Sequence, residues 1–140
     1  MKIKLENDAF MPTKAYESDA GYDLYSREKK VIYPSICNSN ATFDTGVHLQ
    51  IPEGYYGKIE SRSGLNVKNS VVSCGGVIDS HYTGSIKVKL YNFGVEPYIV
   101  HPGDRIAQII IQPFANVNLE QVDDLEDSDR GNSGFGSSGK

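Results

Sequence analysis

The sequence predicts an all-β fold, a barrel or a jelly roll. Three observations support this class. The strand-like segments are short, helical periodicity is nearly absent, and 14 glycines and 6 prolines are spread through the 140 residues. Such spacing of turn residues is typical of a β-rich fold with many turns. The length suits one domain with a true core, and neither a linker nor an internal repeat divides the chain.

The first half of the chain is expected to supply three strands and one short helix. Residues 2–5 open the chain as a strand. A second strand over 44–51 ends at a Pro-Glu-Gly turn signal, and a third over 56–61 follows it. Residues 63–68 are the one helix candidate.

The second half is expected to supply three more strands. Residues 85–92 alternate, with apolar side chains on one face and lysines on the other. Residues 97–100 lead to a turn at His-Pro-Gly. Residues 106–112 are more continuously apolar, which is typical of a strand covered on both sides.

Composition excludes several classes of protein. The formal net charge of −4 argues against direct nucleic-acid binding, which needs a basic face. The two cysteines, Cys37 and Cys74, fit neither a metal-ligand spacing nor a disulfide framework. Reduced thiols in a cytoplasmic protein are therefore expected. No segment has the pattern of a signal peptide or of a membrane span, so no membrane partner is expected.

The segment 76–84 reads Gly-Val-Ile-Asp-Ser-His-Tyr-Thr-Gly. Glycine at both ends predicts a tight hairpin that presents Asp79 and Tyr82 at its mouth. A carboxylate beside an apolar strand suits a general base. The same residues equally suit a turn aspartate beside a core tyrosine, so this segment alone leaves both interpretations open.

Two further segments contain polar groups that suit the binding of an anion. Residues 61–65 follow a strand and open the short helix, so a serine and backbone amides would lie at a helix N-terminus. Residues 103–108 begin another strand and place the amide of Gln108 after apolar residues. In isolation, the first also suits a capped surface turn and the second an ordinary strand start.

The end of the chain is rich in glycine and serine, which is usual for a linker. Residues 130–139 nevertheless include Arg130 and Phe135, which suit phosphate pairing and stacking on a planar base. The preceding residues 120–129 hold six carboxylates and no cation, as a solvated connection would. We expect a β-rich catalytic domain over 1–128 and a flexible tail over 129–140.

Together with residues 20–26, these segments resemble the five ordered motifs of the trimeric dUTP pyrophosphatases (dUTPases). The motifs stand here as residues 20–26, 62–65, 76–84, 103–108 and 130–139. The resemblance implies a distorted jelly roll that assembles as a homotrimer, with active sites at subunit interfaces. It also implies that the tail closes over an active site built largely by other subunits.

The activity implied by this resemblance is hydrolysis of dUTP to dUMP and pyrophosphate by Mg²⁺-assisted attack of water on the α-phosphorus. This reaction keeps uracil out of DNA and supplies dUMP. By resemblance, Asp79 is the general base and Gln108 helps to hold the attacking water. Asp23 would hold waters of a Mg²⁺ that the three phosphates chelate, since Mg²⁺ keeps much of its water shell.

The resemblance also implies which residues bind the substrate. Tyr82 would pack on the deoxyribose, and backbone groups beside Gly76 and Ile78 would pair with uracil. Arg62, Ser63 and Gly64 would bind the α- and β-phosphates. Arg130, Ser137 and Ser138 would bind the γ-phosphate. Phe135 would lie over the uracil, with Gly136 beside it in the tail.

Three positions depart from the family pattern. His81 stands where a second Asp is common, Ser133 replaces a common glycine, and Ser138 stands where Thr is frequent. We interpret His81 as a solvent-facing side chain without a catalytic role. The Ser133 change affects the expected backbone shape of the tail, and Ser138 keeps the hydroxyl.

Two alternatives were weighed against dUTP hydrolysis. The dCTP deaminases share the fold, but they carry a catalytic glutamate where this chain has Lys89, and they lack the Phe-Gly-Ser tail. A non-catalytic nucleotide-binding or regulatory protein is the other alternative. Some phage-borne dUTPases also engage host regulators, so a regulatory protein partner is expected if this chain is phage-borne.

Overall fold

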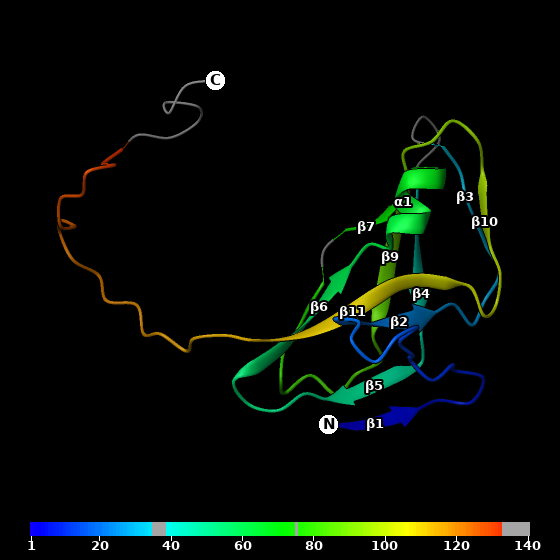
Figure 1. Cartoon of the computed structure of the whole chain (residues 1–140), viewed down its shortest axis with the longest axis horizontal. Helices are drawn as coiled ribbons and strands as arrows, with labels where there is room; N and C mark the ends of the chain where they lie inside the picture. Colours follow the sequence, from blue (N-terminus) through cyan, green and yellow to red (C-terminus); the bar gives the residue numbers. More distant parts are fainter. Residues whose placement is uncertain (35–38, 75, 133–140) are drawn as a thin grey trace.

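The computed structural model describes residues 1–34, 39–74 and 76–132 of the chain. Cys37 and the tail residues Ser133, Phe135, Gly136, Ser137 and Ser138 lie outside the described residues. The described elements appear in Figure 1 in the following order: β1 (Lys2–Leu5), β2 (Gly21–Tyr25), β3 (Lys30–Ile32), β4 (Asn40–Asp44), β5 (Val47–Gln50), β6 (Tyr55–Glu60), α1 (Ser63–Asn69), β7 (Val71–Ser73), β8 (Val77–Ile78), β9 (Lys87–Asn92), β10 (Tyr98–Val100) and β11 (Arg105–Pro113).

The strands form small antiparallel sheets. The largest has the order β2-β11-β6-β8, and a second has the order β4-β9-β7. The pairs β1-β5 and β10-β3 complete the fold. β11 is an inner strand of the largest sheet, where Gln108 lies opposite Asp23 of β2 on one side and Glu60 of β6 on the other. The all-β prediction is therefore confirmed.

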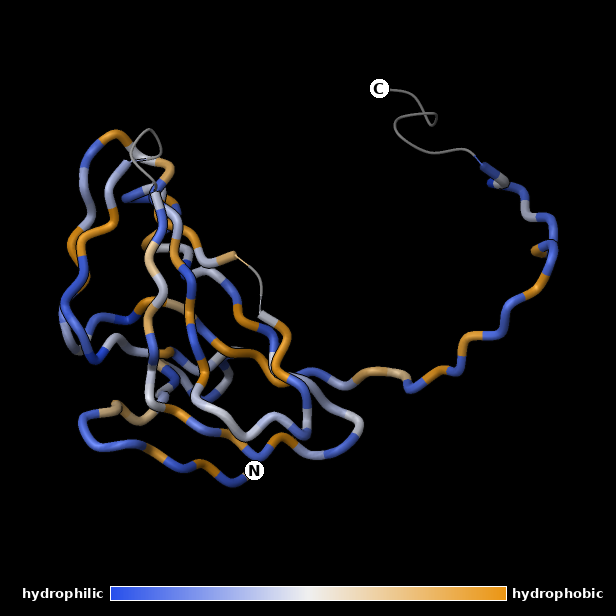
Figure 2. Tube along the Cα trace, turned by 180° about the vertical axis from the view of Figure 1, so that it is seen from behind, coloured by the Kyte–Doolittle hydropathy of each residue, from blue (hydrophilic) through white to orange (hydrophobic). Residues whose placement is uncertain are grey.

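The core follows from the alternation of apolar and polar side chains. On β9, Ile86, Val88 and Leu90 belong to one buried face that starts just before the strand, whereas Lys87 and Lys89 are exposed. Figure 2 shows orange and blue segments alternating along the strands in the same way. This confirms the two-residue period expected for 85–92. The buried hydrophobic side chains of the sheets form one core cluster.

The strand expected over 44–51 is confirmed only as β5, and its predicted start at residue 44 is wrong. The chain breaks after β4, because Thr45 and Gly46 turn it into a different sheet. The Thr45 hydroxyl is buried and donates to the Ile86 carbonyl at 2.7 Å. Gly46 has φ +66°, and a Cβ there would lie 2.9 Å from the Ala9 Cβ. Five strands that the sequence did not reveal, β2, β3, β4, β7 and β8, are short, at two to five residues each.

The tight hairpin expected over 76–84 is also wrong. β8 pairs with β6, but β9 pairs with β4 and β7, so the strands on either side of Asp79 belong to different sheets. Residues 79–86 are therefore a loop that crosses from one sheet to the other, named here the crossing loop. A tight turn does exist inside it, since the Tyr82 amide donates to the Asp79 carbonyl at 3.1 Å.

Beyond β11, residues 114–132 leave the body of the protein as an extended segment without strand or helix (Figure 1). The six carboxylates between 120 and 129 lie on this segment, and all of residues 120–129 are exposed, as expected for a solvated connection. In the parts of the chain that the structure describes, no helix has the length and apolarity needed to cross a membrane.

Candidate active site

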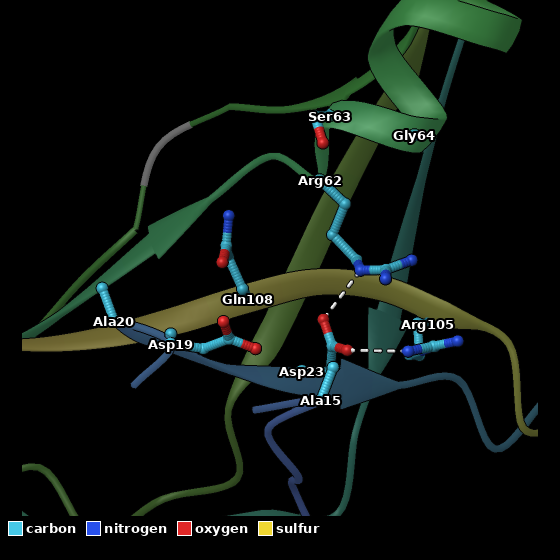
Figure 3. Close-up of a pocket in the computed structure, with 10 residues that line it drawn as sticks. Ala15, Asp19, Ala20, Asp23, Arg62, Ser63, Gly64, Arg105 and Gln108 are labelled. Carbon is cyan, nitrogen blue, oxygen red and sulfur yellow. Dashed lines mark hydrogen bonds and ion pairs between the residues drawn. The ribbon is translucent and has the colours of Figure 1, made fainter. Parts of the chain in front are cut away.

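A cleft lies beside the middle of the inner strand β11 (Figure 3). β2, the start of α1, and β11 supply its walls, together with the segment that leads into β2. Its lining includes five residues predicted from the sequence: Asp23, Arg62, Ser63, Gly64 and Gln108. Its volume is about 280 Å³, which is at the small end for a ligand site.

Two arginines hold Asp23 in the cleft. The Nε of Arg62 donates to Oδ1 of Asp23 at 2.7 Å, and Nη1 of Arg105 donates to Oδ2 at 3.2 Å. Only 13% of the Asp23 side chain is exposed. Both carboxylate oxygens therefore accept a charge-assisted hydrogen bond, which fixes the orientation of all three side chains.

Arg105 is a cleft residue that the sequence reasoning missed. It lies three positions before Gln108, and in a regular strand side chains at that spacing point to opposite faces. The pairing of β11 with β2 shifts register between Arg105 and Ala107. Such an irregularity re-aims side chains, and it brings Arg105 and Gln108 to one cleft. No pattern in the sequence predicts this register shift.

The amide of Gln108 is held by its neighbours. Its Nε2 donates to the Ser61 carbonyl at 3.1 Å, which leaves Oε1 to accept a hydrogen bond from water. Gly21 makes the room for this side chain, because a Cβ at that position would lie 2.5 Å from Oε1 of Gln108. The position of Gln108 therefore depends on the absence of a side chain on β2.

The start of α1 lines the cleft through Ser63 and Gly64. Arg62 is the residue before the helix, with an extended backbone, and its side chain makes no capping hydrogen bond. The first turn of α1 contains no acidic residue. Since helix N-terminal amides attract anions, Ser63 and Gly64 suit the binding of phosphate oxygens.

The charges lining the cleft balance. Arg62 and Arg105 are cationic, and Asp19 and Asp23 are anionic. A triphosphate carries several negative charges, so the cleft of one chain does not neutralise it. Within the described residues, no group of three His, Cys, Asp or Glu side chains is arranged to hold a metal ion directly. The two aspartates instead suit contact with a metal through its water ligands.

The other predicted site residues do not line this cleft. Asp79 and Tyr82 are exposed on the crossing loop, and 44% of Tyr82 is accessible to solvent. The core-tyrosine interpretation is therefore wrong. The Tyr82 hydroxyl donates to the Ser85 carbonyl at 3.1 Å. Its ring lies so close to Gly84 that a Cβ there would be 2.5 Å from the hydroxyl oxygen.

Gly76 and Ile78 precede the crossing loop: Gly76 lies just before β8, and Ile78 is its last residue. Gly76 has φ +120°, and a Cβ there would lie 2.7 and 2.8 Å from atoms of Ile59. Only glycine fits this position, because both the backbone angle and the space exclude a side chain. Ile78 pairs with Gly57 of β6. Arg130 lies on the extended segment after β11, outside the residues that line the cleft.

Comparison with known proteins gives consistent matches. The family model described as dUTPase matches residues 7–139. A deoxyuridine 5'-triphosphate nucleotidohydrolase of Clostridium tetani is 43% identical, with coverage of 100% of this chain and 97% of the relative. The mouse enzyme of the same description is 41% identical, with coverage of 99% and 83%.

Solved structures match as well. The Staphylococcus bacteriophage 80alpha dUTPase with dUpNHpp has a TM-score of 0.91 and 33% identity, with coverage of 99% of this chain and 98% of that chain. A mutant dUTPase from phage phi11 of S. aureus, described with a coordinated structural Mg(II) ion, has a TM-score of 0.79 and 30% identity, with coverage of 88% and 96%.

Proposed function

The chain belongs to the dUTPase family and hydrolyses dUTP to dUMP and pyrophosphate, and we propose that two subunits of a homotrimer share each active site. One observation supports the sharing: in one chain the cleft and the crossing loop are separate. The deaminase alternative is not favoured, because the family model and the curated relatives are dUTP hydrolases.

The separation follows from the strand pairing. The cleft lies at the Glu60–Arg62 end of β6, whereas Ile78 pairs with Gly57, three residues earlier on that strand. Because β8 runs antiparallel to β6, the chain moves further from Glu60 as it continues to Asp79. At about 3.3 Å a residue, the offset is at least about 10 Å. A general base must lie within hydrogen-bond reach of its water, so another subunit is required.

In this proposal the cleft binds the phosphates. The guanidinium of Arg62, the Ser63 hydroxyl and the amides of Ser63 and Gly64 contact the α- and β-phosphates. Oε1 of Gln108 accepts a hydrogen bond from the attacking water, since its Nε2 is already engaged by Ser61. Arg105 joins Arg62 in offsetting phosphate charge.

The crossing loop of a second subunit carries the chemistry. Asp79 takes the proton of a water that attacks the α-phosphorus, and pyrophosphate leaves as the phosphorus–oxygen bond breaks. Tyr82 packs on the deoxyribose and leaves no room for a 2′-hydroxyl. The backbone beside Gly76 and Ile78 pairs with uracil.

A metal cofactor is supported by the family and by the Mg(II) ion of the phi11 relative. We propose that this cofactor is Mg²⁺ and that Asp23 holds its water ligands. Mg²⁺ on the triphosphate would neutralise charge that two arginines beside two aspartates cannot. Asp23 fits an outer-shell role, because both of its oxygens already accept hydrogen bonds from arginines.

The tail completes the proposal. Residues 129–140 would close over an active site as a segment separate from the domain over 1–128. Arg130, Ser137 and Ser138 would bind the γ-phosphate, Phe135 would cover the uracil, and Gly136 would let the backbone approach the nucleotide. A cytoplasmic location and, for a phage-borne chain, a regulatory protein partner stay predictions. The partner is suggested by phage relatives described as controlling transfer of virulence genes.

Mixed trimers test the shared site. Arg62→Ala disables the cleft and Asp79→Asn disables the loop, so each homotrimer should lose activity. If each site combines a cleft and a loop from different chains, co-assembly at equal amounts restores about one quarter of wild-type activity by random pairing.

The matched control mixes Arg62→Ala with Gln108→Ala, both in the cleft, where no combination of chains restores a site. Light scattering and mass spectrometry establish that mixed trimers form. Mixed trimers of the first pair that stay inactive would contradict a shared site.

A further inference from the structure

The crossing loop is held by a network of charged residues that do not line the cleft. We propose that Glu6 and His48 position this loop, and with it Tyr82, for the sugar of the substrate. Neither residue contacts the cleft. Each would act through the backbone of the loop, as a positioning residue. The inference rests on the proposed role of Tyr82 as the residue that senses the sugar.

His48 holds the loop from β5. Its Nδ1 lies 2.8 Å from the carbonyl oxygen of Thr83, the residue after Tyr82. Its Nε2 lies 3.0 Å from Oε1 of Glu6, which follows β1. Only 19% of the His48 side chain is exposed. The imidazole therefore joins the N-terminal segment to the loop through one partly buried ring.

The same glutamate leads to a second attachment of the loop. Oε2 of Glu6 accepts from Nη1 of Arg27 at 2.7 Å, and Nη2 of Arg27 lies 3.3 Å from Oδ1 of Asp44. That carboxylate oxygen accepts from the Ser85 hydroxyl. Thr83 and Ser85 are thus both anchored through one continuous network, on the two sides of Gly84. The Tyr82 hydroxyl also donates to the carbonyl of Ser85.

The partners of His48 require a protonated ring. A carbonyl oxygen and a carboxylate oxygen both only accept hydrogen bonds, so both ring nitrogens must donate, and only the imidazolium has two N–H groups. The Thr83 carbonyl and then Glu6 raise the pKa of His48 above its usual value. His48 and then Arg27 lower the pKa of Glu6.

Other charged groups face this pair. Lys4 lies opposite His48 on the paired strand β1 and opposes the rise of the His48 pKa. Lys2 lines one shallow groove together with Lys4 and His48, and Arg27 forms an ion pair with Glu6. The pairing with Thr83 and Glu6 outweighs these cations, since the pKa of His48 is raised overall.

The direction of the pH effect follows. Because the folded pKa of His48 is raised, the network is complete at low pH and is lost as the pH rises through that pKa. Neutral His48 keeps one N–H and must release either Thr83 or Glu6. Tyr82 then loses its fixed position, so binding of dUTP weakens and discrimination against UTP falls. Asp79 lies further from both anchors, so kcat should change less than KM.

The proposal is tested by steady-state kinetics with dUTP and UTP from pH 6 to 9. The full-length wild type is compared with His48→Gln and Glu6→Gln. The matched control is His101→Gln, on an exposed turn. Loss of one such anchor should raise KM for dUTP about three- to tenfold and lower the dUTP/UTP ratio of kcat/KM by a similar factor. The wild type should show a rise of KM with pH that His48→Gln abolishes. His101→Gln should match the wild type.

Two further measurements make failure distinguishable. NMR titration of the histidine ring signals should show the pKa of His48 above the usual value for a histidine, and Glu6→Gln should lower it. Tyr82→Ala tests the proposed function itself: an unchanged dUTP/UTP ratio in this variant would overturn the role of Tyr82. A ratio that falls in Tyr82→Ala but not in folded His48→Gln and Glu6→Gln would overturn the positioning role. A His48 ring that is neutral at pH 6 would do the same.

Discussion

The cleft and the crossing loop differ in how their side chains are held. In the cleft, the polar groups bind one another: Asp23 pairs with two arginines, and Gln108 donates to Ser61. On the crossing loop, Asp79 and Tyr82 are exposed in a single chain, and the loop is anchored from outside the site through Thr83 and Ser85. The cleft is therefore already formed in one chain, whereas the crossing loop presents Asp79 and Tyr82 outward.

This difference has a physical reason. Partly buried charged groups need partners of the opposite charge, and in the cleft β2, β11 and the residue before α1 supply them. The Asp79 carboxylate makes no side-chain hydrogen bond or ion pair within the described part of the chain, so it is available to a water molecule. The contrast predicts that loss of the Asp79 carboxylate affects the chemical step, while a change at Gly21 affects the arrangement of Gln108 in the cleft.

The largest expected effect comes from Asp79→Asn. It removes the proposed base without changing shape, so kcat should fall by about two to four orders of magnitude. Binding of dUpNHpp, measured by calorimetry, should stay within a few-fold of wild type, because the Asp79 side chain makes no hydrogen bond or ion pair within the described residues. An Asp79→Asn enzyme that turns over dUTP at near wild-type rate would show that the base lies elsewhere.

A smaller effect is expected from Gly21→Ala, which tests the cleft. The added Cβ would displace the Gln108 amide from its bond with Ser61, and loss of one positioned hydrogen bond should lower kcat about tenfold. The double variant with Gln108→Ala is the control. If Gly21 acts through Gln108, the two effects are not additive, and additive losses would show that Gly21 has a different role.

The smallest effect is expected from His81→Asp. His81 lies on the crossing loop and is exposed, but unlike Thr83 and Ser85 it makes no contact with the anchoring network. Activity should stay within an order of magnitude, with at most a modest shift of the pH profile. An inactive but folded variant would mean that exposed positions of the loop are as constrained as its anchors.

Sequence reasoning performed best where the signal was local. The alternation over 85–92 predicted the buried face of β9. The ordered motifs predicted Asp23, Arg62, Ser63, Gly64 and Gln108 as site residues, and in the structure these five line one cleft. It failed at the hairpin over 76–84, because Gly-flanked turns look alike whether the next strand returns to the same sheet or enters another.

The all-β class, the family and the residue types of the proposed site can be predicted from the sequence alone, because periodicity and motif order are visible along the chain. Two features depend on strand pairing in the folded chain: Arg105 enters the cleft through an irregularity in β11, and Glu6 contacts His48 and Arg27 in the network that holds the crossing loop. Glu6 and His48 are 42 positions apart. Contacts at such separations arise from how the strands pair in space, and no local pattern records them.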